Sequence, residues 1–396
     1  MSKITPLTEI EQRIKRLQKY MKTSGIAGAI ILHKVNLFYF TGRVGPICFF
    51  IPVEGMPVFI SRQRDDLPSG LPWPVRSFGR WADLSAVLGE FGYPGEGTLG
   101  LEVDAIPGAV YLKIGEVFPS CRLADLGSAI RIQRAVKSAW EISLLRETAE
   151  IDRVMWNMVP RFARQARTDL ELAAMIEAEA RRLGHVGLLR LHGFNMEMAL
   201  SCVLAGEDGS VVSAYDVPIS GTGLTPALPF GASGALLRPG NPIIIDFGGC
   251  YNGYITDYTR TFVLGEPRAE VLYAYESALA VQTEVIAHAR PGVTGGELFE
   301  RASKVAAQSG LREYFMGGAG GVPFIGHGIG LEVDELPVLA KESKQVLEVG
   351  MVIALEPKFA IPGIGAVGIE NDFIITAGGI ERLSDLTDDL GYISLE

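Results

Sequence analysis

The stretch that decides the fold is residues 242–262, which read PIIIDFGGCYNGYITDYTRTF. Asn252-Gly253 is a strong signal for a β-hairpin with a two-residue type I′ turn, in which both central residues take positive φ. Counting outward from this turn pairs Asp246 with Thr259 across the two strands. The segment therefore predicts an antiparallel hairpin with long apolar strands.

This register brings two acids together. Asp257 lies on the same face as Asp246, one diagonal step away, at about 7 Å between backbones. Because Asp246 follows the apolar run III, we expect it to be buried, and a buried acid needs a partner. Two unrelated turn or surface acids are the alternative, but the apolar flanks favour two carboxylates that converge on a metal site.

A second hairpin is predicted over residues 351–376, MVIALEPKFAIPGIGAVGIENDFIIT. A two-residue turn at Pro362-Gly363 would place Glu356 and Glu370 on opposite faces, whereas an odd loop centred on Gly363 places them directly opposite each other. We predict the odd loop.

Between the hairpins lies FIGHGIGLEVDELP, residues 324–337. The glycines on both sides of His327 allow close approach of backbone to the imidazole or to its ligand. No GKS/T follows, which excludes a phosphate-binding loop. A lone histidine is more often structural, but one imidazole together with four carboxylates makes a hard, oxygen-rich site suited to manganese, iron, cobalt or zinc. Such a set suits two divalent ions that activate a water; its members are Asp246, Asp257, His327, Glu356 and Glu370.

The composition narrows the class of protein. The 396 residues carry a net charge of −10, which argues against a general binder of nucleic acid or of anionic membranes. The four cysteines form no CxxC pair, so neither a thiolate zinc site nor a disulfide framework is expected. We see no signal peptide and no apolar run long enough to cross a membrane. The expected location is the cytoplasm.

Two domains are expected. Residues 1–127 alternate helices and strands, including a helix over Glu9–Thr23, and predict an α/β domain with a mixed sheet. Residues 128–396 run helices then strands twice over, which suggests a pseudo-twofold α+β domain. One long amphipathic helix is predicted over residues 137–163.

With these residues in place, the sequence resembles the pita-bread metallopeptidases, which include methionine aminopeptidase, prolidase, aminopeptidase P and the metal-free creatinase. The likeness rests on Asp246 and Asp257 followed by TRT, on GHGIG around His327, on the EP that begins at Glu356 and on the IE that ends in Glu370. It extends over the N-terminal domain and the VKSAWEI segment and is strongest to the prolidase branch.

The resemblance implies that the five residues bind two divalent metal ions, with manganese favoured and cobalt, iron or zinc as alternatives. Asp257 and Glu370 would bridge the ions, and Glu356 would also serve as general base. His327 would bind one ion through one ring nitrogen. Relatives of this architecture are commonly homodimers.

The sequence departs from the family pattern at two positions. Phe230, in LPFG, and Asp334, in VDELP, stand where peptidases of the family have histidines that contact the substrate. Losing one such donor typically costs about 10²–10³ in rate. Phe230 either forms an apolar wall of the site or only packs in the core, and the sequence leaves both roles open. Asp334 acts as a base, grips a cationic substrate group, or begins a loop.

Two more side chains have open roles. His192 is a possible substitute donor, although a core or surface role is favoured. Arg260 either holds a substrate carboxylate or pairs with a ligand acid, and we favour the pairing.

Three functions fit this sequence. The first is a metal-dependent hydrolase of the Xaa-Pro dipeptidase or aminopeptidase type, acting on a short peptide or small amide. The second is a lyase-type enzyme on the same metal site, with Asp334 abstracting a proton. The third is a non-catalytic binding relative, which ranks last because four clustered buried acids without cations would be costly.

Overall fold

The computed structural model describes residues 3–45, 48–61, 72–195 and 197–395. Contacts divide the chain into two compact units, residues 1–134 with 193–195, and residues 135–192 with 196–396. Helix α5 (Gly127–Ala135) begins at the last residue of the predicted first domain and ends where the second unit begins. No helix within the described ranges is long and apolar enough to cross a membrane.

The first unit is built on a six-stranded mixed sheet, as predicted, with the order β4-β3-β2-β1-β5-β6. Its central strand β1 is antiparallel to β2 and parallel to β5. The predicted first helix is present as α1, which ends at Gly25 in the left-handed conformation (φ 66°) that a glycine adopts without strain. The elements of this unit are β1 (Gly28–Ile31), β2 (Cys48–Pro52), β3 (Val58–Ser61), β4 (Val75–Ser77), β5 (Gly97–Leu101), β6 (Cys121–Asp125), α1 (Leu7–Ser24), α2 (Lys34–Thr41), α3 (Leu84–Gly89), α4 (Gly108–Val117) and α5.

The second unit repeats helices followed by strands. Its helices are α6 (Ala139–Trp156), α7 (Val159–Gln165), α8 (Asp169–Arg182), α9 (Ala269–His288) and α10 (Gly295–Gln308). Its strands are β7 (Ser201–Ala205), β8 (Pro242–Cys250), β9 (Ile255–Leu264), β10 (Phe324–Gly328), β11 (Glu335–Ala340), β12 (Val352–Leu355), β13 (Lys358–Ile361), β14 (Gly365–Gly368), β15 (Asn371–Thr376), β16 (Gly379–Arg382) and β17 (Gly391–Ile393).

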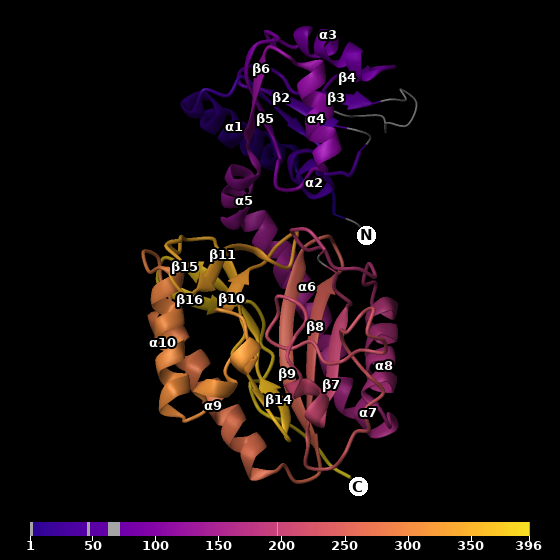
Figure 1. Ribbon diagram of the computed structural model, residues 1–396, viewed down its shortest axis with the longest axis vertical. Helices are drawn as coiled ribbons and strands as arrows, with labels where there is room; N and C mark the ends of the chain where they lie inside the picture. The colour runs from indigo at the N-terminus through magenta and orange to yellow at the C-terminus, as the bar shows by residue number, and fades with distance from the viewer. Residues whose placement is uncertain (1–2, 46–47, 62–71, 196, 396) are drawn as a thin grey trace. The chain divides into compact units, whose positions relative to one another are not determined.

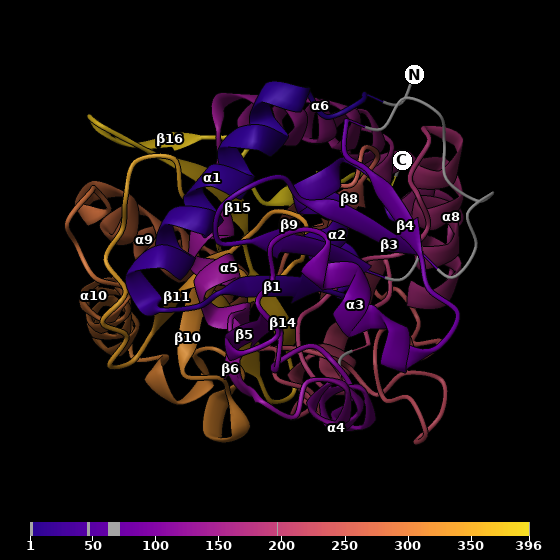
Figure 2. The ribbon, with the colours of Figure 1, turned by 90° about the horizontal axis from the view of Figure 1, so that it is seen from above.

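The strands lie between two groups of helices. Within this unit α7 and α8 flank one side, and α9 and α10 flank the other (Figures 1 and 2). Helix α8 packs on β7 and α6 on β8 and β9, while α9 packs on β14 and α10 on β11. The strands form sheets in the orders β17-β9-β8-β7 and β11-β10-β12-β15-β16, with β13 and β14 as a separate pair.

The single long helix predicted over residues 137–163 is wrong in one respect, because two helices replace it. Helix α6 starts at a capping box in which Ser138 and Glu141 satisfy each other's backbone N–H groups. It ends at Trp156, and α7 restarts with Pro160 in its first turn. Proline has no N–H to donate to the preceding turn, so it favours a fresh helix start over continuation.

Both hairpin registers are confirmed, but the type I′ turn predicted at Asn252-Gly253 is wrong, because Gly253 has φ 96° whereas Asn252 does not take a positive φ. Strands β8 and β9 pair Asp246 with Thr259 and Gly248 with Asp257, which places the two aspartates on the predicted diagonal. In the second hairpin β13 pairs with β14 and β12 with β15 in one common register centred on Gly363. Gly363 has φ 75°, a conformation that glycine takes readily.

Helix α6 places an acid beneath the first hairpin. Asp152 is fully buried and accepts a short hydrogen bond from the Thr256 hydroxyl. Burial raises the pKa of Asp152 to about 7, although the hydrogen bond from Thr256 lowers it in part. A Cβ at Gly249 would collide with the Asp152 carboxylate, so a glycine is required there.

The raised pKa makes stability depend on pH. An acid whose pKa is raised by folding binds more protons in the native state, so its contribution is complete below the unfolded value and is lost as pH rises through about 7. We expect Asp152→Asn to flatten the fall in unfolding free energy between about pH 4 and pH 7, measured by urea unfolding. Parallel pH curves for the variant and the native protein would contradict this assignment.

Candidate metal centre

The fold brings all five predicted site residues into one cluster. Asp246 comes from β8, Asp257 from β9 and His327 from β10. Glu356 stands between β12 and β13, and Glu370 stands opposite it between β14 and β15.

Backbone hydrogen bonds fix the two glutamates. The N–H of Glu370 donates to the carbonyl of Thr259 (3.0 Å), and the N–H of Glu356 donates to the carbonyl of Ile325 (3.0 Å). These bonds tie the second hairpin to β9 and to β10, which carry Asp257 and His327.

A lysine lies at the centre of the acids. The Lys358 Nζ donates to Asp246 Oδ2 (2.8 Å), Glu356 Oε2 (2.7 Å) and Glu370 Oε2 (2.7 Å). Its side chain is only 1% exposed. An ammonium group has three N–H donors, so all of them are used by these carboxylates.

The electrostatics of the cluster follow from burial and charge together. Burial by itself lowers the pKa of Lys358, but the carboxylates of Asp246, Glu356 and Glu370 outweigh it, and that pKa lies well above its ordinary value. Burial raises the pKa of Glu370 to about 7, an effect that the Lys358 ammonium reduces in part. Asp246, with a side chain 24% exposed, is less buried than the sequence predicted.

The other side of the cluster has the geometry of a cation site. One ligand atom each from Asp257, His327 and Glu370 lie within 4.8 Å of one another. Glu370 Oε1 is buried without a hydrogen-bond partner among the described residues, and it lies 4.0 Å from His327 Nε2. By contrast, Oε2 of the same carboxylate accepts from both Thr259 and Lys358. An unsatisfied buried carboxylate oxygen beside an imidazole calls for a cation.

His327 is oriented for this task. Its Nδ1 lies 3.1 Å from the carbonyl oxygen of Gly328. Donation from Nδ1 to that carbonyl leaves a lone pair on Nε2, the nitrogen that faces Glu356 (3.6 Å) and Glu370. The side chains of Asp257, His327 and Glu370 therefore fit one divalent ion.

The glycines around His327 serve a different purpose from the one predicted. A Cβ at Gly326 would collide with the carbonyl oxygen of Ala354 on β12, and one at Gly328 with that of Leu336 on β11. They admit the neighbouring strands rather than the imidazole or a ligand, because β10 lies between β11 and β12 in the sheet.

The two departures from the family pattern occupy different surroundings. Phe230 packs edge-to-face on Tyr215 (5.4 Å between ring centres) and against an apolar cluster that includes Ile219 and Ile244. Asp334 Oδ1 accepts the backbone N–H of His192 (2.7 Å), and the His192 ring lies 3.7 Å from Glu332. Burial raises the pKa of Asp334, and the bond from His192 lowers it in part.

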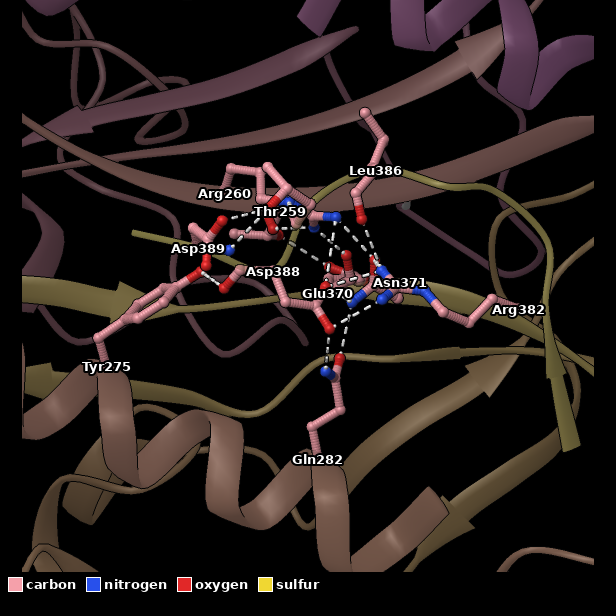
Figure 3. A network of polar contacts seen from close by, with 11 residues as sticks. Thr259, Arg260, Tyr275, Gln282, Glu370, Asn371, Arg382, Leu386, Asp388 and Asp389 are labelled. Atoms are coloured by element: carbon pink, nitrogen blue, oxygen red, sulfur yellow. Dashed lines mark hydrogen bonds and ion pairs between the residues drawn. The ribbon is translucent and has the colours of Figure 1, made fainter. Parts of the chain in front are cut away.

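Arg260 pairs with no predicted ligand carboxylate, so the favoured expectation for it is wrong; the ion pair that its guanidinium makes is with Asp388 (3.7 Å). Its guanidinium donates to the backbone carbonyls of Thr259, Glu370 and Thr387 and to the Asn371 side chain. Figure 3 shows this network, which continues through Asn371. Arg260 thus holds the backbone of Glu370 and leaves its carboxylate to the cluster.

Lys358 is the site residue that the sequence reasoning missed. It stands two residues after Glu356, and side chains two apart in an extended segment point to the same face. The alternation in EPKF was therefore a sufficient signal that a cation enters the cluster of acids.

The chain belongs to metallopeptidase family M24, whose family model matches residues 143–377. The creatinase/prolidase N-terminal domain model matches residues 13–136. Together with the two units, these matches identify the second unit as the pita-bread domain.

Individual relatives extend over nearly the whole chain. It is 27% identical to the Xaa-Pro dipeptidase of Pyrococcus furiosus, over 95% of this chain and 98% of that protein. It is 31% identical to the probable dipeptidase PepE of Mycobacterium tuberculosis, over 93% of this chain and 92% of that protein.

Solved structures agree. The dipeptidase PepE from Mycobacterium ulcerans superposes with a TM-score of 0.79 at 25% identity, covering 98% of each chain. The prolidase from Pyrococcus horikoshii gives a TM-score of 0.76 at 25% identity, covering 96% of this chain and 99% of that one.

The Arg260 network predicts a large loss of stability on truncation. We expect Arg260→Met to lower the unfolding free energy by about 3–5 kcal/mol, because several buried acceptors lose their charged donor. Urea unfolding measures this loss. The matched control Arg268→Met removes a partly exposed arginine that pairs with Glu270 and donates to the Gly363 carbonyl, and we expect a change within about 1 kcal/mol. Similar losses in both variants would contradict the structural role.

Proposed function

We propose that this chain is a metal-dependent hydrolase that cleaves the peptide or amide bond of a short peptide or small amide. Support comes from its membership of a metallopeptidase family, from dipeptidase relatives that match nearly its whole length, and from the cluster in which Asp257, His327 and Glu370 fit a divalent ion. The observation that carries the proposal is the buried, unsatisfied Glu370 Oε1 beside His327 Nε2.

The ion and the general base have distinct places in this site. When bound, a divalent cation acts as a Lewis acid toward the substrate carbonyl. We assign Asp257, His327 and Glu370 as its ligands, and manganese as the ion, because the donor set is rich in carboxylate oxygen. Asp246 and Glu356, also predicted as ligands, direct one oxygen each to Lys358.

Glu356 is the proposed general base. Its Oε2 is hydrogen-bonded to Lys358, and its Oε1 faces His327 Nε2 at 3.6 Å. Oε1 is therefore the oxygen available to take a proton from the attacking water. The ammonium holds the carboxylate in position while that proton moves.

Asp334 is proposed as a positioning residue. Its carboxylate holds the backbone of His192, and the N–H of Val333 donates to the carbonyl of Arg190 (2.8 Å), so the two segments run side by side. Through this contact Asp334 fixes the segment that ends in His192.

The resemblance to the pita-bread family also supports two further proposals: that the protein is a homodimer and that it is located in the cytoplasm.

The hydrolase proposal is tested on a panel of Xaa-Pro and other dipeptides with manganese-loaded protein. We expect cleavage of at least one dipeptide, and we expect Glu356→Gln to lower kcat by about 10²–10⁴. Glutamine keeps an oxygen that accepts from Lys358, so elemental analysis should find the same metal content in both proteins. Absence of cleavage across the panel by fully loaded protein would reject the peptidase function.

Two substitutions of Asp334 distinguish a positioning role from proton abstraction. An asparagine oxygen still accepts the His192 N–H but cannot act as a base, whereas alanine does neither. We expect Asp334→Asn to retain kcat within about tenfold and Asp334→Ala to lose more, with turnover of the best dipeptide as the readout. Equal, complete loss in both variants would contradict the positioning role and assign the Asp334 carboxylate a direct part in proton transfer.

A further inference from the structure

We propose that Lys358 is a built-in cation that takes the place of one of two metal ions, so that this site binds a single divalent ion. The inference deepens the proposed function and rests on it, since it concerns the same cluster of acids. It departs from the expectation of two ions.

The position of the ammonium leaves no room for a second ion. Its Nζ contacts Asp246, Glu356 and Glu370 at 2.7–2.8 Å. A divalent transition metal bound to these oxygens would sit at about 2.0–2.2 Å from each of them. An ion so placed would overlap the volume that Nζ fills.

Charge leads to the same conclusion. Two divalent ions would neutralise the four predicted ligand carboxylates, next to which Asp372 is a fifth, buried acid that accepts the backbone N–H of Asp257. With the Lys358 ammonium present, one divalent ion leaves the four ligand carboxylates with a single net negative charge, so the lysine removes much of the need for a second ion. The second ion would also face an adjacent ammonium in a buried site, where like charges repel strongly.

The fold makes space for this lysine. Lys358 pairs with Gly368 across β13 and β14. A Cβ at Gly368 would lie 2.7 Å from both the Lys358 Cγ and the Pro357 carbonyl oxygen, so a side chain there would displace the lysine stem and the backbone that carries it. Gly368 does not take a positive φ. The reason for a glycine at this position is therefore the lack of room for a side chain and not the backbone conformation.

Glu370 is the link between the two cations. Its Oε2 accepts from Lys358, and its Oε1 is the unsatisfied atom beside His327. One carboxylate therefore bridges a resident ammonium and a bound ion. Because all three Lys358 N–H groups are used, the lysine acts as a fixed counterion and not as a nucleophile or a donor to the substrate.

The test counts metal ions. Native protein is saturated with manganese, and bound ions per chain are measured by elemental analysis and by calorimetric titration. We expect about one ion in the native protein and about two in Lys358→Ala, which removes both the charge and the bulk. Electron paramagnetic resonance should show isolated manganese in the native protein and an exchange-coupled pair in the variant.

Two control variants sharpen the comparison. Lys358→Met removes the charge but keeps most of the bulk, and we expect it to remain at one ion. Lys341→Ala removes an exposed lysine, and we expect one ion there as well. Circular dichroism and thermal unfolding establish that each variant is folded.

The outcomes separate this inference from the proposed function. Two ions in the native protein would overturn the inference and leave the hydrolase proposal standing. One ion in both the native protein and Lys358→Ala would also overturn it, because the lysine would not be what excludes the second ion. No ion in any variant would reject both. If Lys358→Ala does not fold, the ion count and resonance spectrum of the native protein still decide.

Discussion

The structure of the second unit depends on compensating the negative charge of acids gathered at one point. Asp257, Glu356 and Glu370 are buried, and Asp246 borders them. Taking several carboxylates out of water is costly unless cations and hydrogen-bond donors replace the lost solvation. Lys358 supplies one cation within the chain, and the arrangement of Glu370 Oε1 and His327 Nε2 provides for another.

The surrounding elements keep this cluster in place. Two hairpins supply the four acids, and backbone bonds join the second hairpin to β9 and β10. Behind the cluster, Arg260 holds the backbone of Glu370 and leaves its carboxylate to face the cations. The site is thus built on strands and a buried charged network, which gives it a defined geometry before a substrate arrives.

Membership of the metallopeptidase family bears on which reaction the protein catalyses, whereas the contacts of individual side chains bear on how it does so. The family match and the dipeptidase relatives support hydrolysis, as the sequence motifs predicted. The surroundings of Phe230, Asp334 and Lys358 concern how this member carries it out. Phe230 packs into an apolar cluster, and Asp334 holds the backbone of His192.

The sequence by itself determined the two hairpins and their registers, because the position of a turn and the two-residue period of a strand are local properties; it did not determine the type of turn at Asn252-Gly253. It also determined which acids meet, since register decides which side chains share a face. It did not determine what those acids contact. That Lys358 reaches three of them, that Arg260 binds backbone rather than a carboxylate, and that the glycines beside His327 admit strands were decided by tertiary structure. The bonds from Lys358 to Asp246 and from Arg260 to the backbone of Glu370 join residues 112 and 110 positions apart. Contacts between such distant segments follow from packing, not from local patterns.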